Sequence, residues 1–383
     1  MLNDTLAAPH ALQTGDALEG LLATIRAEAL EFRALRRIPQ PVVEQFRSVG
    51  VYRALVARRF GGLEVSPMTF LDLIETIAHA DASAGWVASF GVSATYLAAL
   101  PIPTLEKLYA HGPDVVFAGA IFPPQKARPV DGGFMVSGRW PYASGCPGAS
   151  LIGVGIAVEG ETGGLPRTAV LPRSSVQIDE TWDTIGLAGT GSHDVVVEDV
   201  FVPHEWTFIR GGAPSLDAPI YAYPSLGLAA QVLTVVGLGC ARRAIDEART
   251  MAGRGSITGA PVMGDRPFVQ GVLGQAEAKL SAARAFFYDI TREVWGQLCA
   301  GETISDKQAN KVRLAATHGA QTAFDVARDC FSLGGIAAVR SDNILGRCFQ
   351  DCAVVAQHAF MARGNYEAAG RVMLGRGDRP GYP

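Results

Sequence analysis

The chain has 383 residues, of which 48% are hydrophobic and 18% charged, and its formal net charge is −4. A chain of this length buries roughly 75% of the surface that it exposes when unfolded, so it can build a large core in one elaborate unit or several domains. Its near-neutral charge argues against a nucleic acid partner, and no apolar run reaches the roughly 18 residues of a membrane helix. We therefore expect a cytoplasmic protein.

The first third of the chain, residues 1–113, has the periodicity of α-helices. Apolar residues recur at i, i+3, i+4 and i+7 over residues 16–32, which predicts an amphipathic helix. Pro41 suits the first turn of a second helix, and Ser66-Pro67 opens a third. Another helix is predicted through Trp86 and Phe90 as far as residue 100. These elements predict an N-terminal helical domain.

Residues 114–212 have a different texture, with short β-branched runs separated by turn residues. The run from Val130 to Val136 is interrupted by Asp131-Gly132-Gly133, the pattern of a hairpin. Further short runs at 151–154 and 195–197 predict additional strands. We therefore expect a middle β-domain.

Helical periodicity returns in residues 213–383, where three long helices are expected. The last of these is capped by Ser305 and reaches about Phe331. Helices of these lengths span roughly 30 to 40 Å, the proportions of an antiparallel bundle. The expected fold class is therefore α+β and mostly α, with a C-terminal four-helix bundle.

Six cysteines are present, and none forms a C-x-x-C pair. Cys348 and Cys352 are one helical turn apart, but no His or Cys pair at zinc spacing accompanies them. We therefore expect no metal site and interpret the cysteines as reduced residues of the core.

The segment from Ser137 to Cys146 carries the strongest single indication of a binding site. Trp140 and Tyr142 stand four and two residues before Ser144, and alternate residues of a strand share one face. This arrangement would give a flat ring system an aromatic wall and a hydroxyl partner. A buried sheet edge followed by a Ser-Gly turn is the alternative interpretation.

Four motifs in this order resemble the acyl-CoA dehydrogenase superfamily: residues 54–63, 137–146, 186–192 and 200–203. The resemblance implies a helical domain, a β-domain and a helical bundle, as the composition also suggests. It places Tyr142 where the family usually has a Trp, and Ser144 where it has the Thr beside flavin N5. Thr190 and Ser192 fall in the family's Gly-x-x-x-Thr-x-Ser turn, and with Trp140 they complete the implied cofactor site.

The region of the dehydrogenase base distinguishes two branches of this superfamily. Dehydrogenases of one branch carry a Glu there, whereas this chain has His358, seven residues after Asp351. The segment resembles the two-component flavin-dependent monooxygenases of the same fold. These use reduced FAD or FMN and O2, through a flavin C4a-hydroperoxide, to hydroxylate or epoxidise a small aromatic or heteroaromatic such as an indole or phenol. A separate NAD(P)H flavin reductase supplies the reduced flavin.

The resemblance also implies residue roles. His358 would be an acid or base, with Ser144 as the second catalytic residue, and Trp86, Phe90, Ser93 and His358 would line the substrate pocket. Many such enzymes have a His where this chain has Ser93, so phenol deprotonation by that route is in doubt. Arg254 with Ser256, and Gly334-Gly335 from a neighbouring subunit, would hold the distal part of the flavin, which implies a homotetramer.

Several alternatives remain open from the sequence. His358 could be a structural histidine packed against Asp351, and Arg254 and Gly334-Gly335 could be an ordinary loop arginine and helix C-cap. The whole chain could instead be an acyl-CoA dehydrogenase with FAD and an unusual base, an N-oxygenase of the same fold, or a flavin-binding protein without activity.

Overall fold

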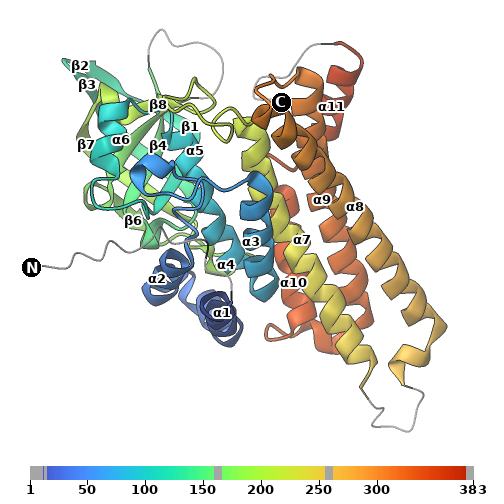
Figure 1. The fold of residues 1–383 in the computed structure, drawn as a ribbon. Coiled ribbons are helices and arrows are strands. Elements are labelled where there is room, and N and C mark those ends of the chain that lie inside the picture. The colour runs from blue at the N-terminus through green and yellow to red at the C-terminus, as the bar shows by residue number, and fades with distance from the viewer. Residues whose placement is uncertain (1–11, 13–14, 159–165, 255–261, 377–383) are drawn as a thin grey trace, which may run out of the picture.

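The computed structural model describes residues 12, 15–158, 166–254 and 262–376. Along the chain, helices precede and follow the strands of two small sheets, and in space the sheets lie to one side of the C-terminal helices (Figure 1). The N-terminal helices are α1 (Asp16–Leu35), α2 (Gln40–Val49), α3 (Pro67–Ala80), α4 (Ala82–Ala88), α5 (Ser93–Leu97) and α6 (Ile102–Leu108). Pro41 occupies the first turn of α2 and the Ser66 hydroxyl caps α3, as predicted.

The prediction of one continuous helix from residue 86 to residue 100 is wrong. A 3₁₀ turn over Ser89–Val92 separates α4 from α5. Gly91 lies in this turn, and a Cβ atom at this position would be 2.4 Å from the carbonyl oxygen of Val51. Close packing against that backbone therefore combines with the low helix propensity of glycine to break the helix.

The middle of the chain forms two four-stranded sheets, with strand orders β1-β4-β5-β8 and β2-β3-β7-β6. β1 and β4 are parallel, and the other pairs are antiparallel. The predicted hairpin is the β2–β3 pair. The strands are β1 (Phe117–Lys126), β2 (Arg128–Val130), β3 (Gly133–Ala143), β4 (Leu151–Ala157), β5 (Arg167–Pro172), β6 (Gln177–Asp179), β7 (His193–Pro203) and β8 (Thr207–Ile209).

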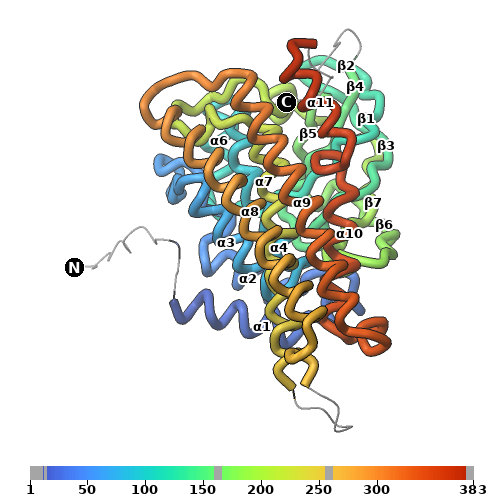
Figure 2. Tube along the Cα trace, turned by 90° about the vertical axis from the view of Figure 1, so that its right-hand side faces the viewer, coloured from blue at the N-terminus to red at the C-terminus, as the bar shows by residue number. Residues whose placement is uncertain are grey.

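The C-terminal helices run alongside one another in a bundle (Figure 2). They are α7 (Ser225–Ala252), α8 (Pro267–Cys299), α9 (Asp306–Leu333) and α10 (Ile344–Gln357), followed by the short α11 (Gly364–Met373). Ser305 and Gln308 form a capping box at the start of α9, which confirms the predicted N-cap. The bundle packs against the rest of the molecule through α7, which contacts α3 and α4.

α7 is long and apolar enough by composition to cross a membrane, but 83% of its most apolar window is buried inside the protein. Gly and Ala residues let neighbouring helices approach it on all sides, which is the character of a core helix. All six cysteines are free thiols, and five of them are buried. No group of three metal-ligating side chains occurs among the described residues.

Candidate active site

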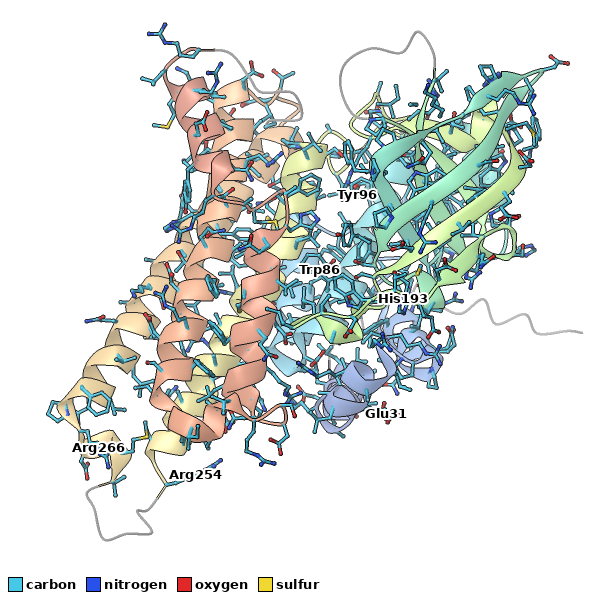
Figure 3. All side chains as sticks on the ribbon, turned by 180° about the vertical axis from the view of Figure 1, so that it is seen from behind. Glu31, Trp86, Tyr96, His193, Arg254 and Arg266 are labelled. Atoms are coloured by element: carbon cyan, nitrogen blue, oxygen red, sulfur yellow. The ribbon has the colours of Figure 1, made fainter. Side chains whose placement is uncertain are left out.

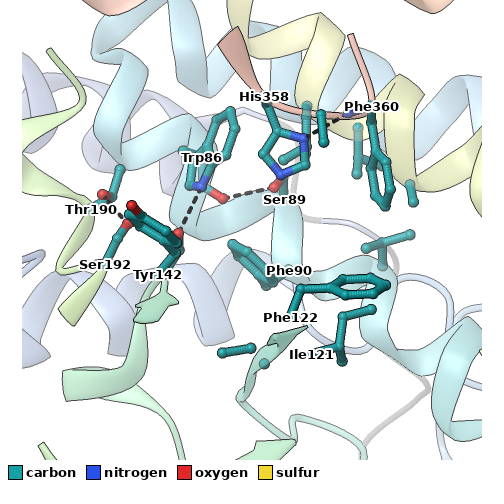
Figure 4. A pocket seen from close by; sticks show the side chains of 18 of the residues that line it. Trp86, Ser89, Phe90, Ile121, Phe122, Tyr142, Thr190, Ser192, His358 and Phe360 are labelled. Carbon is teal, nitrogen blue, oxygen red and sulfur yellow. Dashed lines mark hydrogen bonds between the residues drawn. The ribbon is translucent and has the colours of Figure 1, made fainter. Parts of the chain in front are cut away.

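A cavity of about 610 Å³ lies where the β-domain meets the helices. Its walls come from β1, from α4 and the 3₁₀ turn after it, from α7, and from the segment that follows α10. Figure 4 shows Thr190 and Ser192 on one side of this cavity and Phe360 on the other, with Trp86 and His358 between them. Sequence-distant segments therefore meet around one largely aromatic space.

A chain of buried hydroxyl groups lies at one end of the cavity. The Trp86 Nε1–H donates to Ser144 Oγ at 3.1 Å, and Ser144 Oγ lies 2.7 Å from Ser192 Oγ. Ser192 Oγ is 2.6 Å from Thr190 Oγ1, which donates to the carbonyl oxygen of Leu187 at 2.9 Å. The structure thus brings together three of the predicted cofactor residues and Trp86.

The direction of these hydrogen bonds follows from their two ends. The indole N–H can only donate, and the Leu187 carbonyl can only accept. Because Thr190 gives its proton to Leu187, Ser192 donates to Thr190 and Ser144 donates to Ser192. Ser144 Oγ accepts from Trp86 and keeps one lone pair, so toward the cavity it is an acceptor.

The prediction that Trp140, Tyr142 and Ser144 share one face is wrong. The pairing of β3 with β7 is irregular between Trp140 and Ala143, and Tyr142 has a φ of 65°. The strand alternation is therefore interrupted. Trp140 is fully buried, donates to the carbonyl oxygen of Gly155 at 2.7 Å, and does not line the cavity. Tyr142 does line it, with its side chain 69% exposed.

His358 caps the C-terminal end of α10 instead of lying within the helix. Its Nδ1 accepts a hydrogen bond from the Phe360 backbone N–H at 3.2 Å. In the neutral ring the proton is therefore on Nε2. The imidazole packs edge-on against Trp86, with ring centres 5.7 Å apart.

The surroundings of His358 oppose its protonation. Burial lowers the pKa of the imidazole to about 4, and the nearby positive charges of Arg210 and Arg313 act in the same direction. At neutral pH the residue is thus an uncharged hydrogen-bond donor at Nε2. To act as a general base, the imidazole would have to accept a second proton and become a cation, which its burial and the nearby arginines disfavour.

His358 does not pack against Asp351, the structural role that the sequence left open; it contacts Trp86 and Phe360 instead. Asp351 Oδ1 accepts from the Leu187 backbone N–H at 2.6 Å. Burial raises the pKa of Asp351 to about 7, and the nearby Asp81 adds to this shift. A Cβ atom on Gly186 would be 2.2 Å from the carbonyl oxygen of Gln350, so this turn and α10 are in close contact. Asp351 therefore ties α10 to the turn that carries Thr190.

The predicted substrate residues are only partly correct. Trp86, Phe90 and His358 line the cavity, whereas Ser93 is buried outside its lining. The 3₁₀ turn changes which side chains face inward, so that Ser89 and Val92 take this place. Sequence reasoning missed further lining residues for which no motif gave a signal: Tyr96, Phe117, Phe122, Arg210 and Phe360.

The predicted distal cofactor residues do not reach this cavity within one chain. Arg254 follows α7 at the far end of the bundle from Trp86 (Figure 3). Its guanidinium lies 3.6 Å from Glu247. Gly334 caps the C-terminal end of α9, and Gly335 has a φ of 54°. Ser256 falls outside the described residues.

The cavity combines polar and aromatic groups that suit an isoalloxazine ring. The hydroxyl cluster lies at one end, and aromatic side chains of Tyr142 and Trp182 stand beside it with ring centres 6.3 Å apart. Thr168 Oγ1 also lines this space and is buried without a hydrogen-bond partner. An unpaired buried hydroxyl is unfavourable unless a ligand satisfies it. The residues present therefore fit a flavin.

Comparisons with known proteins agree with this geometry. The family described as "Acyl-CoA dehydrogenase, C-terminal domain" matches residues 231–363. The chain is 53% identical to an indole-3-acetate monooxygenase of Pseudomonas putida, over 98% of both chains. It is 30% identical to the oxygenase subunit HsaA of a flavin-dependent monooxygenase of Rhodococcus jostii, over 94% of this chain and 97% of the relative. The crystal structure of the 3-HSA hydroxylase from Rhodococcus sp. RHA1 superimposes with a TM-score of 0.90, at 28% identity over 95% and 97% of the two chains.

Proposed function

Because this chain belongs to the flavin-dependent monooxygenases of the acyl-CoA dehydrogenase fold, as an oxygenase component, we propose that it hydroxylates or epoxidises an indole with an acidic side chain, of the indole-3-acetate type. The observation that carries this proposal is the cavity, which combines a hydroxyl cluster suited to a flavin with an aromatic chamber. One relative, 53% identical over 98% of this chain, and a second, 48% identical over 95% of it, bear the name of that substrate.

The residues that would hold the flavin are Ser144, Ser192, Thr190 and Tyr142. A bound reduced flavin supplies the electrons that activate O2 and the site from which one oxygen atom is transferred. Ser144 is suited to the reduced form, since its free lone pair can accept from the N5–H that reduced flavin carries. Trp86, Ser192 and Thr190 position Ser144 by fixing its own proton toward Ser192.

His358 would act as a neutral donor through Nε2. Phe360 engages Nδ1 and Trp86 packs against the ring, so the imidazole is held in one orientation. A donor at this position can orient the group to be transferred or the substrate without a proton being lost from the protein. Proton abstraction from a phenol, the other role that the sequence suggested, fits a pKa of about 4 less well.

The aromatic walls would keep water from the reacting atoms. Phe90, Phe117, Phe122 and Phe360 line the chamber beside Trp86 and His358. A dry site favours transfer of oxygen to the ring over its release as hydrogen peroxide.

The partners follow from the same reading. As an oxygenase component the chain works with a separate flavin reductase. Its sequence contains no Gly-x-Gly-x-x-Gly motif, the usual signature of an NAD(P)H-binding turn. We place the enzyme in the cytoplasm, in keeping with its free cysteines. A homotetramer would bring Arg254 and Gly334-Gly335 of one subunit to the flavin of another; a monomer by light scattering would contradict this.

The dehydrogenase alternative lacks its central group, since no Asp or Glu occurs among the described residues that line the cavity. An oxygenase component and an acyl-CoA dehydrogenase can be distinguished by the substrates with which they react. With reductase, NADH and reduced flavin, we expect indole-3-acetate to yield an oxygenated product with oxygen consumption. Anaerobic bleaching of bound oxidised flavin by an acyl-CoA, without oxygenation of any indole, would contradict the proposal.

A further inference from the structure

Arg210 projects a positive charge into the aromatic end of the cavity. It directly follows β8, and it is the one Arg or Lys among the described lining residues. Its guanidinium carbon lies 3.8 Å from the ring centre of Tyr96 and 5.5 Å from that of Phe360. Stacking on these rings fixes the guanidinium plane and leaves N–H groups at its edge for a ligand.

No carboxylate of the described residues forms an ion pair with Arg210, whereas arginines away from the cavity, such as Arg242 and Arg284, do form such pairs. The Nε atom is buried and has no hydrogen-bond partner. A cation beside an apolar wall is unfavourable unless an anion pairs with it. The described cavity lining offers no Asp or Glu for that purpose.

Arg210 is also placed at the correct end of the cavity for a substrate group. Phe360, whose ring it approaches, packs against His358 with ring centres 5.0 Å apart. Figure 4 shows Phe360 on the side opposite Thr190 and Ser192. An aromatic ring between these two ends would lie beside Trp86 and His358, with its side chain directed toward Arg210.

We infer that Arg210 binds the carboxylate of the substrate, so that the cavity selects aryl acids over neutral arenes of the same shape. The inference rests on the proposed function and adds to it the residue that binds the acidic group of the substrate. A guanidinium can donate two parallel N–H bonds to a carboxylate, which fixes orientation as well as affinity. The aromatic ring is thereby held in one register relative to the hydroxyl cluster.

The test compares indole-3-acetate with indole-3-acetamide, which has the same shape without the charge. Dissociation constants are measured by calorimetry, and kcat and KM with reductase and NADH, for the wild type and for Arg210→Met and Arg210→Lys. Arg167→Met is the matched control, since Arg167 is opposite Ile209 in the β5–β8 pair and does not line the cavity. Affinity for reduced flavin is measured in every variant.

For Arg210→Met we expect a loss of about 10- to 100-fold in affinity for indole-3-acetate, the scale of a charged hydrogen-bonded pair. Affinity for indole-3-acetamide should change less than about 3-fold, and Arg210→Lys should recover part of the loss. Arg167→Met should leave both ligands unchanged. An equal loss for both ligands, no loss for either, or weakened flavin binding with unaltered discrimination would overturn the inference.

The outcome also separates this inference from the proposed function. Oxygenation of indole-3-acetate that is insensitive to Arg210→Met would refute the role of Arg210 and leave the function standing. Arg210-dependent binding of indole-3-acetate to a wild type that never oxygenates it would refute the function and uphold the anion site.

Discussion

At Ser144, the direction of the hydrogen bonds favours the reduced form of the flavin over the oxidised form. The Trp86 N–H at one end of the hydroxyl chain and the Leu187 carbonyl at the other leave Ser144 as an acceptor toward the cavity. Ser144→Ala removes this acceptor, an effect of the order of 1 kcal/mol or more. We expect weaker binding of reduced flavin and a larger share of consumed oxygen released as hydrogen peroxide.

Coupling of oxygen consumption to product, measured by chromatography with a peroxide assay, checks this prediction. Ser150→Ala is a suitable control, because that hydroxyl bonds the Val116 carbonyl and does not line the cavity. Coupling in Ser144→Ala as complete as in the wild type would show that Ser144 has no role at the flavin.

His358 is expected to work as a donor, and its pH behaviour distinguishes this from a base. With a pKa of about 4, the imidazole does not titrate between pH 6 and 8, so the oxygenation rate should show no inflection from this residue. His358→Ala should be slower by roughly 100-fold, while His358→Gln, which keeps an N–H donor, should retain more activity. An inflection near pH 6.5 that disappears in His358→Gln would identify a base instead.

The same pKa shift predicts a pH-dependent stability. Between pH 4 and about 6.5 the unfolded chain binds a proton at His358 that the folded protein excludes, so stability is lost as the pH falls. From pH 7 to pH 5 the free energy of unfolding should fall by about 2 kcal/mol more in the wild type than in His358→Asn. The raised pKa of Asp351 has the opposite effect, but it is common to both proteins.

Urea unfolding of both proteins at the two pH values measures this difference. Equal changes in the two proteins would mean that His358 is not held neutral by the fold.

At the scale of elements, the local patterns predicted the regular parts and failed where packing bends the chain. The capping residues of α3 and α9 and the β2–β3 hairpin were readable from the sequence because their signals are local. The irregularity at Tyr142 was not, since it depends on how β3 meets β7. For this reason Trp140 was assigned to the cofactor site although it belongs to the core.

The break between α4 and α5 has the same origin. Gly91 was visible in the sequence, but only the approach of the Val51 backbone explains why the helix cannot continue. The resulting 3₁₀ turn moves Ser93 out of the lining and brings Ser89 and Val92 into it. A contact between segments far apart in sequence thus decided which side chains face the substrate.

The link between α10 and the 186–190 turn is a second element-level feature with a measurable consequence. Asp351→Ala would leave the buried Leu187 N–H without an acceptor, at a cost of about 1 to 3 kcal/mol in stability. Loosening of the turn should also weaken reduced-flavin binding through Thr190. Asp351→Asn retains an oxygen acceptor and should be close to the wild type in both respects.

Chemical unfolding and anaerobic flavin titration of the two variants measure these effects. If Asp351→Ala and Asp351→Asn behave alike, the hydrogen bond to Leu187 does not support the turn.

At the scale of the whole molecule, the cavity exists only because three regions of the chain converge. The hydroxyls come from the β-domain, Trp86 and Phe90 from the N-terminal helices, and His358 from the end of α10. The motif resemblance could place most of these residues, but Arg210, Tyr96 and Phe360 carry no motif and appear only in three dimensions. Arg254 lies at the far end of the bundle from Trp86, and Gly334 and Gly335 do not line the cavity, so their predicted role requires a second subunit.

The central claim is that this chain transfers one oxygen atom from O2 to an indole-type acid, and isotope labelling tests it most directly. The enzyme is incubated with its reductase, NADH, flavin and indole-3-acetate under ¹⁸O2, and the product is analysed by mass spectrometry. We predict a product that carries one ¹⁸O atom, formed by the wild type and formed roughly 100-fold more slowly by His358→Ala. A product whose oxygen comes from water, or label found only in hydrogen peroxide with indole-3-acetate unchanged, would contradict the account.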